Sequence, residues 1–227
     1  MYNILILFIL HIVGDFYLQS DKVAKKKENL NTFMQIHFVL YSIPFVLLFI
    51  YFKIDVSYLI IIILSHLLID VYSVKLKYKY KEKECLIFCS DQFIHIVIIF
   101  LCSSYMNLPI MLSIKTLISI LAILILIKPT SVLISLTFEV IFKEEKSNSE
   151  LKIGTYIGYL ERIIIFLLCI LNSISTIGFV IAAKTLVRYK DINNNENHFQ
   201  EKYLIGTLLS TIGALCCFTL IKLFSDF

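Results

Sequence analysis

Histidine and aspartate recur at a spacing of four residues inside apolar stretches of this sequence. Three such pairs are present: His11 with Asp15, His66 with Asp70, and Asp91 with His95. Four residues is slightly more than one helical turn, so the two side chains of each pair project from one helix face and can share an ion or a proton. Ionisable groups are costly inside a lipid bilayer and mark a functional site there by default. A further histidine, His37, also lies in an apolar stretch.

The ligand types of this set predict a metal site. Imidazoles and carboxylates without a thiolate suit a divalent transition ion such as zinc, manganese or iron, and the set is large enough for one or two ions. Such an ion activates water against an ester or phosphoester, with an aspartate that is not a ligand as general base. The expected metal ligands are His11, Asp15, His37, His66, Asp70, Asp91 and His95. The expected catalytic residues are Asp15, Asp70 and Asp91.

The composition predicts the solvent in which this chemistry takes place. Hydrophobic residues make up 59% of the 227 residues, charged residues only 17%, and the mean hydropathy is +0.85. The apolar runs are continuous rather than alternating, which favours helices over a β-barrel because helices satisfy their own backbone hydrogen bonds in lipid. We therefore predict an all-α, polytopic transmembrane helical bundle in the cell membrane. The first run, with no cleavage site and with lysines directly behind it, is expected to be a retained span.

The expected bundle has seven or eight spans, at about 20 apolar residues per crossing. The stretch 108–142 contains Lys128-Pro129 at its middle, which favours one bent span. The stretch 154–188 is either one long tilted helix or a hairpin that turns near Asn172-Ser173, and lysine counts slightly favour the hairpin and eight spans. The remaining spans are expected at 3–19, 33–52, 56–74, 86–105 and 203–224.

Two regions are expected within one integrated membrane domain: a four-span motif region at 1–106 and a C-terminal helical region at 107–227. The loops after the first and third spans are rich in lysine and are therefore expected to be cytoplasmic. Asp15, His37, Asp70 and Asp91 then all lie near the cytoplasmic ends of their spans, on the order of 10 Å below the basic surface. This placement predicts one shallow polar cluster that opens toward the cytoplasm.

A site at this depth suits a lipid or a phosphorylated small molecule as substrate. Lys75 is expected to hold an anionic group, and Gln19 and Gln92 are expected to support the site by hydrogen bonding. In the C-terminal region, Gly154 and Gly158 permit close helix packing. Two interpretations are open there: a solvated charge pair on a packed helix, or a second anion pocket. The candidate pocket residues are Glu161, Arg162, Lys184 and Arg188.

Two functions of other classes are kept as alternatives. A metal-ion or proton transporter would use the same ionisable groups, but such transporters usually contain inverted repeats, and the sequence shows no convincing internal repeat. A non-catalytic membrane scaffold would use the polar cluster only to fix helix register. The lysine-rich loops are topology signals and lipid headgroup contacts, so no nucleic-acid partner is expected. The sequence leaves the oligomeric state open.

These motifs resemble a known family of bacterial multi-spanning proteins, the domain-of-unknown-function family 3307. The resemblance is carried by His11-x-x-Gly14-Asp15-Phe16-x-x-Gln19-Ser20, His37, His66-x-x-Ile69-Asp70 with Lys75, and Asp91-Gln92-x-x-His95. The C-terminal half resembles the longer members through Gly154-x-x-x-Gly158-x-x-Glu161-Arg162, Ala183-Lys184 with Arg188, and Glu201-x-Tyr203-Leu204-Ile205-Gly206-Thr207, with Lys202 where an aromatic is expected. The resemblance implies fold and motif but no substrate. The His/Asp arrangement is also similar to that of predicted membrane-bound metal-dependent hydrolases.

Overall fold

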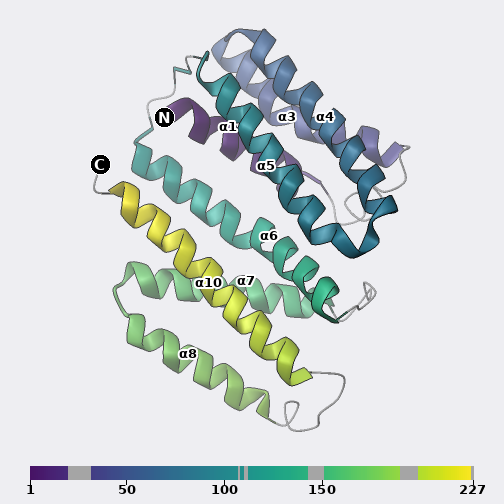
Figure 1. Ribbon diagram of the computed structural model, residues 1–227. Helices are drawn as coiled ribbons and strands as arrows, with labels where there is room; N and C mark the ends of the chain where they lie inside the picture. Colours follow the sequence, from purple (N-terminus) through teal and green to yellow (C-terminus); the bar gives the residue numbers. More distant parts are fainter. Residues whose placement is uncertain (20–31, 107, 110–111, 143–150, 190–198, 226–227) are drawn as a thin grey trace. The chain divides into compact units, whose positions relative to one another are not determined.

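The computed structural model describes residues 1–19, 32–106, 108–109, 112–142, 151–189 and 199–225, and the described chain is all-α (Figure 1). It contains eight α-helices in these ranges, with one π-helical segment, η1, and one 3-10 turn, η2. The elements are α1 (Tyr2–Ile12), η1 (Val13–Tyr17), α3 (Thr32–Phe52), α4 (Val56–Lys79), η2 (Lys81–Lys83), α5 (Glu84–Ser103), α6 (Ile114–Phe142), α7 (Leu151–Ile170), α8 (Ile174–Val187) and α10 (Phe199–Ser225).

Five of the helices are long and apolar enough to cross a membrane: α3, α4, α5, α6 and α10. Only 22% to 33% of the most apolar window in each is buried, so most of these apolar side chains face outward, as a lipid environment requires. The segment Tyr2–Tyr17 and helix α8 are apolar but shorter. The chain is therefore a multi-pass helical membrane protein with five candidate spans, and the total of seven or eight spans stays a prediction.

The chain divides into two compact units, Met1–Leu124 and Ile125–Phe227. The first unit contains α1, η1, α3, α4, α5 and the beginning of α6, and in it α3, α4 and α5 pack side by side (Figure 1). Its core consists of fully buried apolar side chains, among them Leu7, Phe45, Leu59 and Ile99. The predicted boundary near residue 106 stays a prediction.

Local signals fix the turn between α3 and α4. Lys53 has a φ of 50°, in the left-handed region, and ends α3 by donating its N–H to the carbonyl of Phe49 at 2.8 Å. Asp55 caps α4 by accepting the N–H of Ser57 at 2.9 Å, and this hydrogen bond lowers the pKa of the Asp55 carboxyl. The tight turn makes α3 and α4 neighbours, and both helices carry histidines of the motif.

In the second unit the stretch 154–188 forms two helices rather than one long helix. Helix α7 ends at Ile170 and α8 begins at Ile174, with Asn172 in the left-handed region at a φ of 55°. Ser173 donates its N–H to Leu168 at 2.9 Å, and Asn172 donates to Cys169 at 3.0 Å, which is the Schellman pattern that ends a helix. The stretch around Pro129 is one helix, α6, which begins at Ile114 rather than near residue 108.

Candidate metal centre

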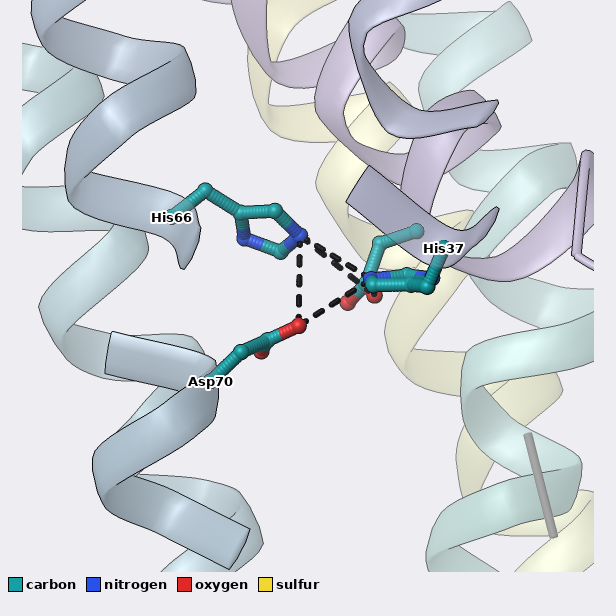
Figure 2. Close-up of side chains that lie close together, drawn as sticks. His37, His66 and Asp70 are labelled. Atoms are coloured by element: carbon teal, nitrogen blue, oxygen red, sulfur yellow. Dashed lines mark hydrogen bonds and ion pairs between the residues drawn. The ribbon is translucent and has the colours of Figure 1, made fainter. Parts of the chain in front are cut away.

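Three elements of the first unit bring four potential ligands together. Asp15 lies on η1, His37 on α3, and His66 with Asp70 on α4. Each residue places one ligand atom within 4.8 Å of the others, and all four residues are buried. Figure 2 shows His37 from one helix directed at the His66–Asp70 pair of another. The buried cluster therefore has the composition of a metal site, formed by residues up to 55 positions apart.

The distances between the ligand atoms of this group are close to those between neighbouring ligands of a bound metal ion. The Nε2 atom of His37 lies 3.2 Å from Nε2 of His66, 3.1 Å from Oδ2 of Asp70 and 3.4 Å from Oδ1 of Asp15. Nε2 of His66 lies 3.7 Å from the same oxygen of Asp70 and 3.9 Å from the same oxygen of Asp15. In a tetrahedral site with ligand bonds of about 2.0–2.1 Å, neighbouring ligand atoms are separated by about 3.3–3.4 Å. The spacing thus fits a tetrahedral ion with small ligand movements.

A second group of ligand atoms shares Asp70 with the first. Asp70, Asp91 and His95 also place ligand atoms within 4.8 Å of one another, and all three are buried. Nε2 of His95 lies 3.8 Å from Oδ1 of Asp70 and 3.7 Å from Oδ2 of Asp91. The two oxygens of Asp70 thus face different groups, and carboxylates that face two ligand sets in this way can bridge a pair of ions about 3.5–4 Å apart.

His11 is buried beside the cluster but is absent from both ligand groups found among the described residues. Its Nδ1 lies 3.1 Å from the Tyr41 hydroxyl, and its ring lies 5.1 Å from that of His95 between centroids. The N–H of Leu18 donates to the carbonyl of Val13 at 3.0 Å, five residues earlier, so the helix widens into a π-turn after His11. This widening changes the angular register between His11 and Asp15, and the four-residue spacing no longer places them as in an α-helix.

A close approach of η1 and α3 holds Asp15 near His37. A Cβ atom on Gly14 would lie 3.0 Å from the carbonyl oxygen of Tyr41 and 3.2 Å from its Cα. These are main-chain atoms that no rotamer change can move, so any larger residue at this crossing would push the two segments apart. The motif glycine thus serves the approach of two segments that each supply a ligand.

Further polar side chains surround the ligands. The Ser73 hydroxyl donates to Oδ1 of Asp91. Gln92 donates from Nε2 to Oδ2 of Asp15 at 3.0 Å and to Oδ2 of Asp91 at 3.2 Å, so it links two carboxylates from different elements. Gln19 has a buried Oε1 without a hydrogen-bond partner among the described residues, and Lys75 is exposed on α4. Gln92 therefore contacts the cluster, whereas no hydrogen bond or ion pair recorded for the described chain links Gln19 or Lys75 to it.

The histidine ring contacts show how the imidazoles are held. Nδ1 of His66 lies 3.1 Å from Nε2 of His95, and the Tyr41 ring stacks on His66 with centroids 3.5 Å apart. A ligand histidine is usually oriented by a partner at its second nitrogen, and His66 meets this condition. Nδ1 of His37 is buried without a hydrogen-bond partner in the described part of the chain.

Lys184 and Arg162 of the second unit donate hydrogen bonds to side chains and main-chain carbonyls of the same unit. Lys184 donates to Oε2 of Glu161 and, at 3.1 Å, to the Thr207 hydroxyl. Arg162 donates from Nε to the Leu126 carbonyl at 2.8 Å and from Nη2 to the Ile127 carbonyl at 3.2 Å.

These carbonyls belong to the turn of α6 that precedes Pro129. Pro129 has no N–H to donate to the Ile125 carbonyl, and the Thr130 hydroxyl donates to that carbonyl instead, at 2.8 Å. Arg162 thus stabilises the proline-interrupted turn. Arg188 lies over the Phe199 ring, 6.0 Å from its centroid. A substrate role of Glu161, Arg162, Lys184 and Arg188 stays a prediction.

Sequence reasoning missed two residues of the first unit, Tyr41 and Ser73. Tyr41 follows His37 by four residues, and Ser73 follows Asp70 by three, so both lie on the helix faces that carry the ligands. A polar residue three or four positions after a candidate ligand was the sequence signal that could have identified both.

The comparisons with known proteins give a family and nothing more specific. A family described as "Protein of unknown function (DUF3307)" matches residues 4–124. No curated protein and no solved structure matches the chain. The match contains all seven predicted ligands and ends before the C-terminal motif residues, so the resemblance of that half to longer members and the similarity to hydrolases stay predictions.

Proposed function

The chain belongs to the DUF3307 family, whose description assigns no function, and we propose from the site that the protein is a membrane-bound, metal-dependent hydrolase. The observation that carries the proposal is the convergence of four buried ligand atoms from Asp15, His37, His66 and Asp70 within 4.8 Å. Two imidazoles and two carboxylates at nearly tetrahedral spacing suit zinc best among the divalent ions. The proposed substrate bond is an ester or phosphoester in a lipid-linked or membrane-proximal molecule.

A divalent ion supplies Lewis acidity toward water and toward the oxygen of the substrate bond. Asp91 is the aspartate left outside the four-ligand group, and we assign it the role of general base. Its Oδ1 accepts the Ser73 hydroxyl, which orients the carboxylate and leaves Oδ2 facing His95 and Gln92. In the proposed reaction Asp91 accepts a proton from water and the water oxygen bonds to the acyl carbon or phosphorus. The bond from that atom to the leaving oxygen breaks, and the leaving oxygen takes up the proton from Asp91.

The second ligand group gives this proposal a two-ion form. Asp70 would then bridge, and Asp91 and His95 would bind the second ion instead of serving as base and support. Metal stoichiometry distinguishes the two forms: one ion per chain supports Asp91 as base, and two ions per chain support it as ligand.

The experiment measures metal content and hydrolysis in detergent-purified protein. The wild type is expected to bind zinc stoichiometrically and to hydrolyse chromogenic p-nitrophenyl esters or phosphodiesters. His66→Ala should lower zinc affinity by about 100-fold or more. His198→Ala, which lies outside the described residues and outside the motif, is the matched control and should retain the metal.

A specific observation supports the scaffold alternative as well. Neutral imidazoles can satisfy one another directly, as His37 with His66 at 3.2 Å and His66 with His95 at 3.1 Å permit. Folded wild-type protein that stays metal-free after reconstitution with zinc, manganese or iron would overturn the hydrolase proposal in favour of this scaffold. Bound metal with flux across proteoliposomes and no hydrolysis would instead favour the transporter.

A further inference from the structure

A groove lies between α4 and α5 on the side of the first unit where Asp91 is located. Its volume is about 350 Å³, at the lower end of the range for small-molecule sites. Apolar side chains of both helices form most of its walls, including Leu68, Leu76, Leu86 and Ile94. Ser73 and Asp91 supply polar atoms to the same walls. The groove therefore joins an apolar surface to the functional cluster.

Asp91 connects the groove to the metal ligands. It lines the groove, and its Oδ2 lies 3.7 Å from Nε2 of His95. Its other oxygen accepts the hydroxyl of Ser73, which lines the groove as well. A molecule in the groove would thus contact the residue to which we assign proton transfer, without crossing the buried core.

The groove opens toward lipid. Three apolar residues that line the groove are exposed, Leu68 at 69%, Leu86 at 65% and Ile94 at 45%, although all three lie on helices apolar enough to span a membrane. Apolar side chains this exposed on spanning helices face hydrocarbon, because contact with water would be unfavourable. A ligand would consequently enter from the bilayer, and the part that fills the apolar walls would be a hydrocarbon chain.

Two lysines extend the groove walls toward the membrane surface. Lys79 follows Leu76 by three residues on α4 and continues the α4 face that lines the groove, and Lys83 is the N-cap residue of α5, the helix that forms the opposite wall. Their ammonium groups approach the same ring, that of Tyr80, at 5.2 Å and 5.9 Å from its centroid. Two exposed positive charges at one end of an apolar groove are complementary to an anionic headgroup.

We propose that the groove between α4 and α5 binds an anionic acyl lipid, with its hydrocarbon chain along the apolar walls and its phosphate at Lys79 and Lys83. The step from Ser73 to Lys79 is six residues, or about 9 Å along the helix, so the phosphate lies nearer the surface than Asp91. The bond beside Asp91 is then a carboxylic ester below the headgroup, not the phosphoester itself.

The ester assignment rests on the proposed hydrolase function, whereas the binding assignment does not. In the cleavage, a water oxygen bonds to the acyl carbon and the bond from that carbon to the alcohol oxygen breaks. One water proton goes through Asp91 to the alcohol oxygen. The products are a fatty acid and the deacylated phosphate lipid, and no oxidant or further reactant is required.

The binding assignment is tested with a single introduced tryptophan, because the chain contains none. Leu86→Trp places the reporter in the groove wall, and Val39→Trp, at a residue 58% exposed on α3, places a matched reporter at lipid away from the groove. The probe is 12-bromododecyl phosphate in an uncharged maltoside detergent, which quenches nearby tryptophan. We expect half-quenching of Leu86→Trp at a concentration at least about 10-fold lower than for Val39→Trp.

Three further arms identify what is bound. Lys79→Gln with Lys83→Gln in the Leu86→Trp protein should raise the half-quenching concentration at least about fivefold. The cationic analogue 12-bromododecyltrimethylammonium should show no preference for the groove reporter, and excess inorganic phosphate should not displace the brominated lipid. Displacement by inorganic phosphate would mean that free phosphate, not a lipid, is recognised and would overturn the proposal.

The same measurement on chelator-treated protein separates this proposal from the hydrolase. Preferential quenching at Leu86→Trp that persists without metal supports the groove even if no zinc is bound and no ester is cleaved. Equal quenching of the two reporters overturns the groove assignment even if zinc binding and hydrolysis of water-soluble esters are found. Release of fatty acid from a monoacyl phosphate lipid, lost in Asp91→Asn, supports the ester assignment, and cleavage at the phosphate instead would overturn it.

Discussion

Replacing Gly14 by alanine would test whether the crossing of η1 over α3 sets the geometry of the metal ligands. Gly14 is adjacent to Asp15, and the atoms that it faces belong to Tyr41, one turn after His37. The substitution removes no ligand and adds one methyl group. Any change in metal affinity must therefore come from a displacement at this crossing, either of η1 relative to α3 or of the Tyr41 ring that stacks on His66.

The expected displacement follows from the contacts. The added Cβ would lie 3.0 Å from the Tyr41 carbonyl oxygen, whereas ordinary contacts begin at 3.4 Å, so the segments must separate by about 0.4 Å. Overpacking of this kind costs about 1–3 kcal/mol, and the gain in helix propensity from glycine to alanine offsets about 1 kcal/mol. Metal–ligand distances tolerate about 0.2 Å, so zinc affinity should fall by about 10-fold or more.

The assay is competition with a chromophoric zinc chelator, together with thermal unfolding in detergent. Gly178→Ala is the matched control, because a Cβ there meets nothing within 4 Å. It should leave zinc affinity unchanged and keep or raise the melting temperature. If Gly14→Ala binds zinc within twofold of wild type and melts at the same temperature, the close approach does not position the ligands and this reasoning is refuted.

Three further predictions test other parts of the fold by melting temperature. Arg162→Met removes the donors to two α6 carbonyls and should cost about 2–4 kcal/mol; a wild-type melting temperature would contradict the stabilising role of Arg162. Asn3→Asp should lower the melting temperature, because a carboxylate cannot donate to the carbonyls of Ser103 and Met106, and an unchanged value would show that these bonds contribute little. Asn172→Gly should be neutral or stabilising and Asn172→Val should cost about 1–2 kcal/mol, since the φ of 55° favours glycine; the reverse order would contradict the turn geometry.

Much of the secondary structure was predictable because helix formation in lipid depends on local composition. Runs of about 20 apolar residues identified α3, α4, α5 and α10 nearly to their ends. Within the span expected at 3–19, the α-helix widens into the π-turn η1 after Ile12, which the sequence did not predict because hydropathy carries no information on helix widening. Likewise, whether residues 154–188 form one helix or two depends on whether Asn172 adopts a left-handed conformation, and apolar content does not specify this.

By itself the sequence determined the chemistry of the candidate site: which imidazoles and carboxylates share a helix face, and that lipid makes them costly to bury without a partner. Only the tertiary structure decided which atoms meet. His37 joins Asp15, His66 and Asp70, whereas His11 faces Tyr41, and Asp70 divides its oxygens between two groups. Helical periodicity fixes directions along one helix. Contacts between helices depend on how closely two backbones cross, which at Gly14 is a matter of tenths of an ångström.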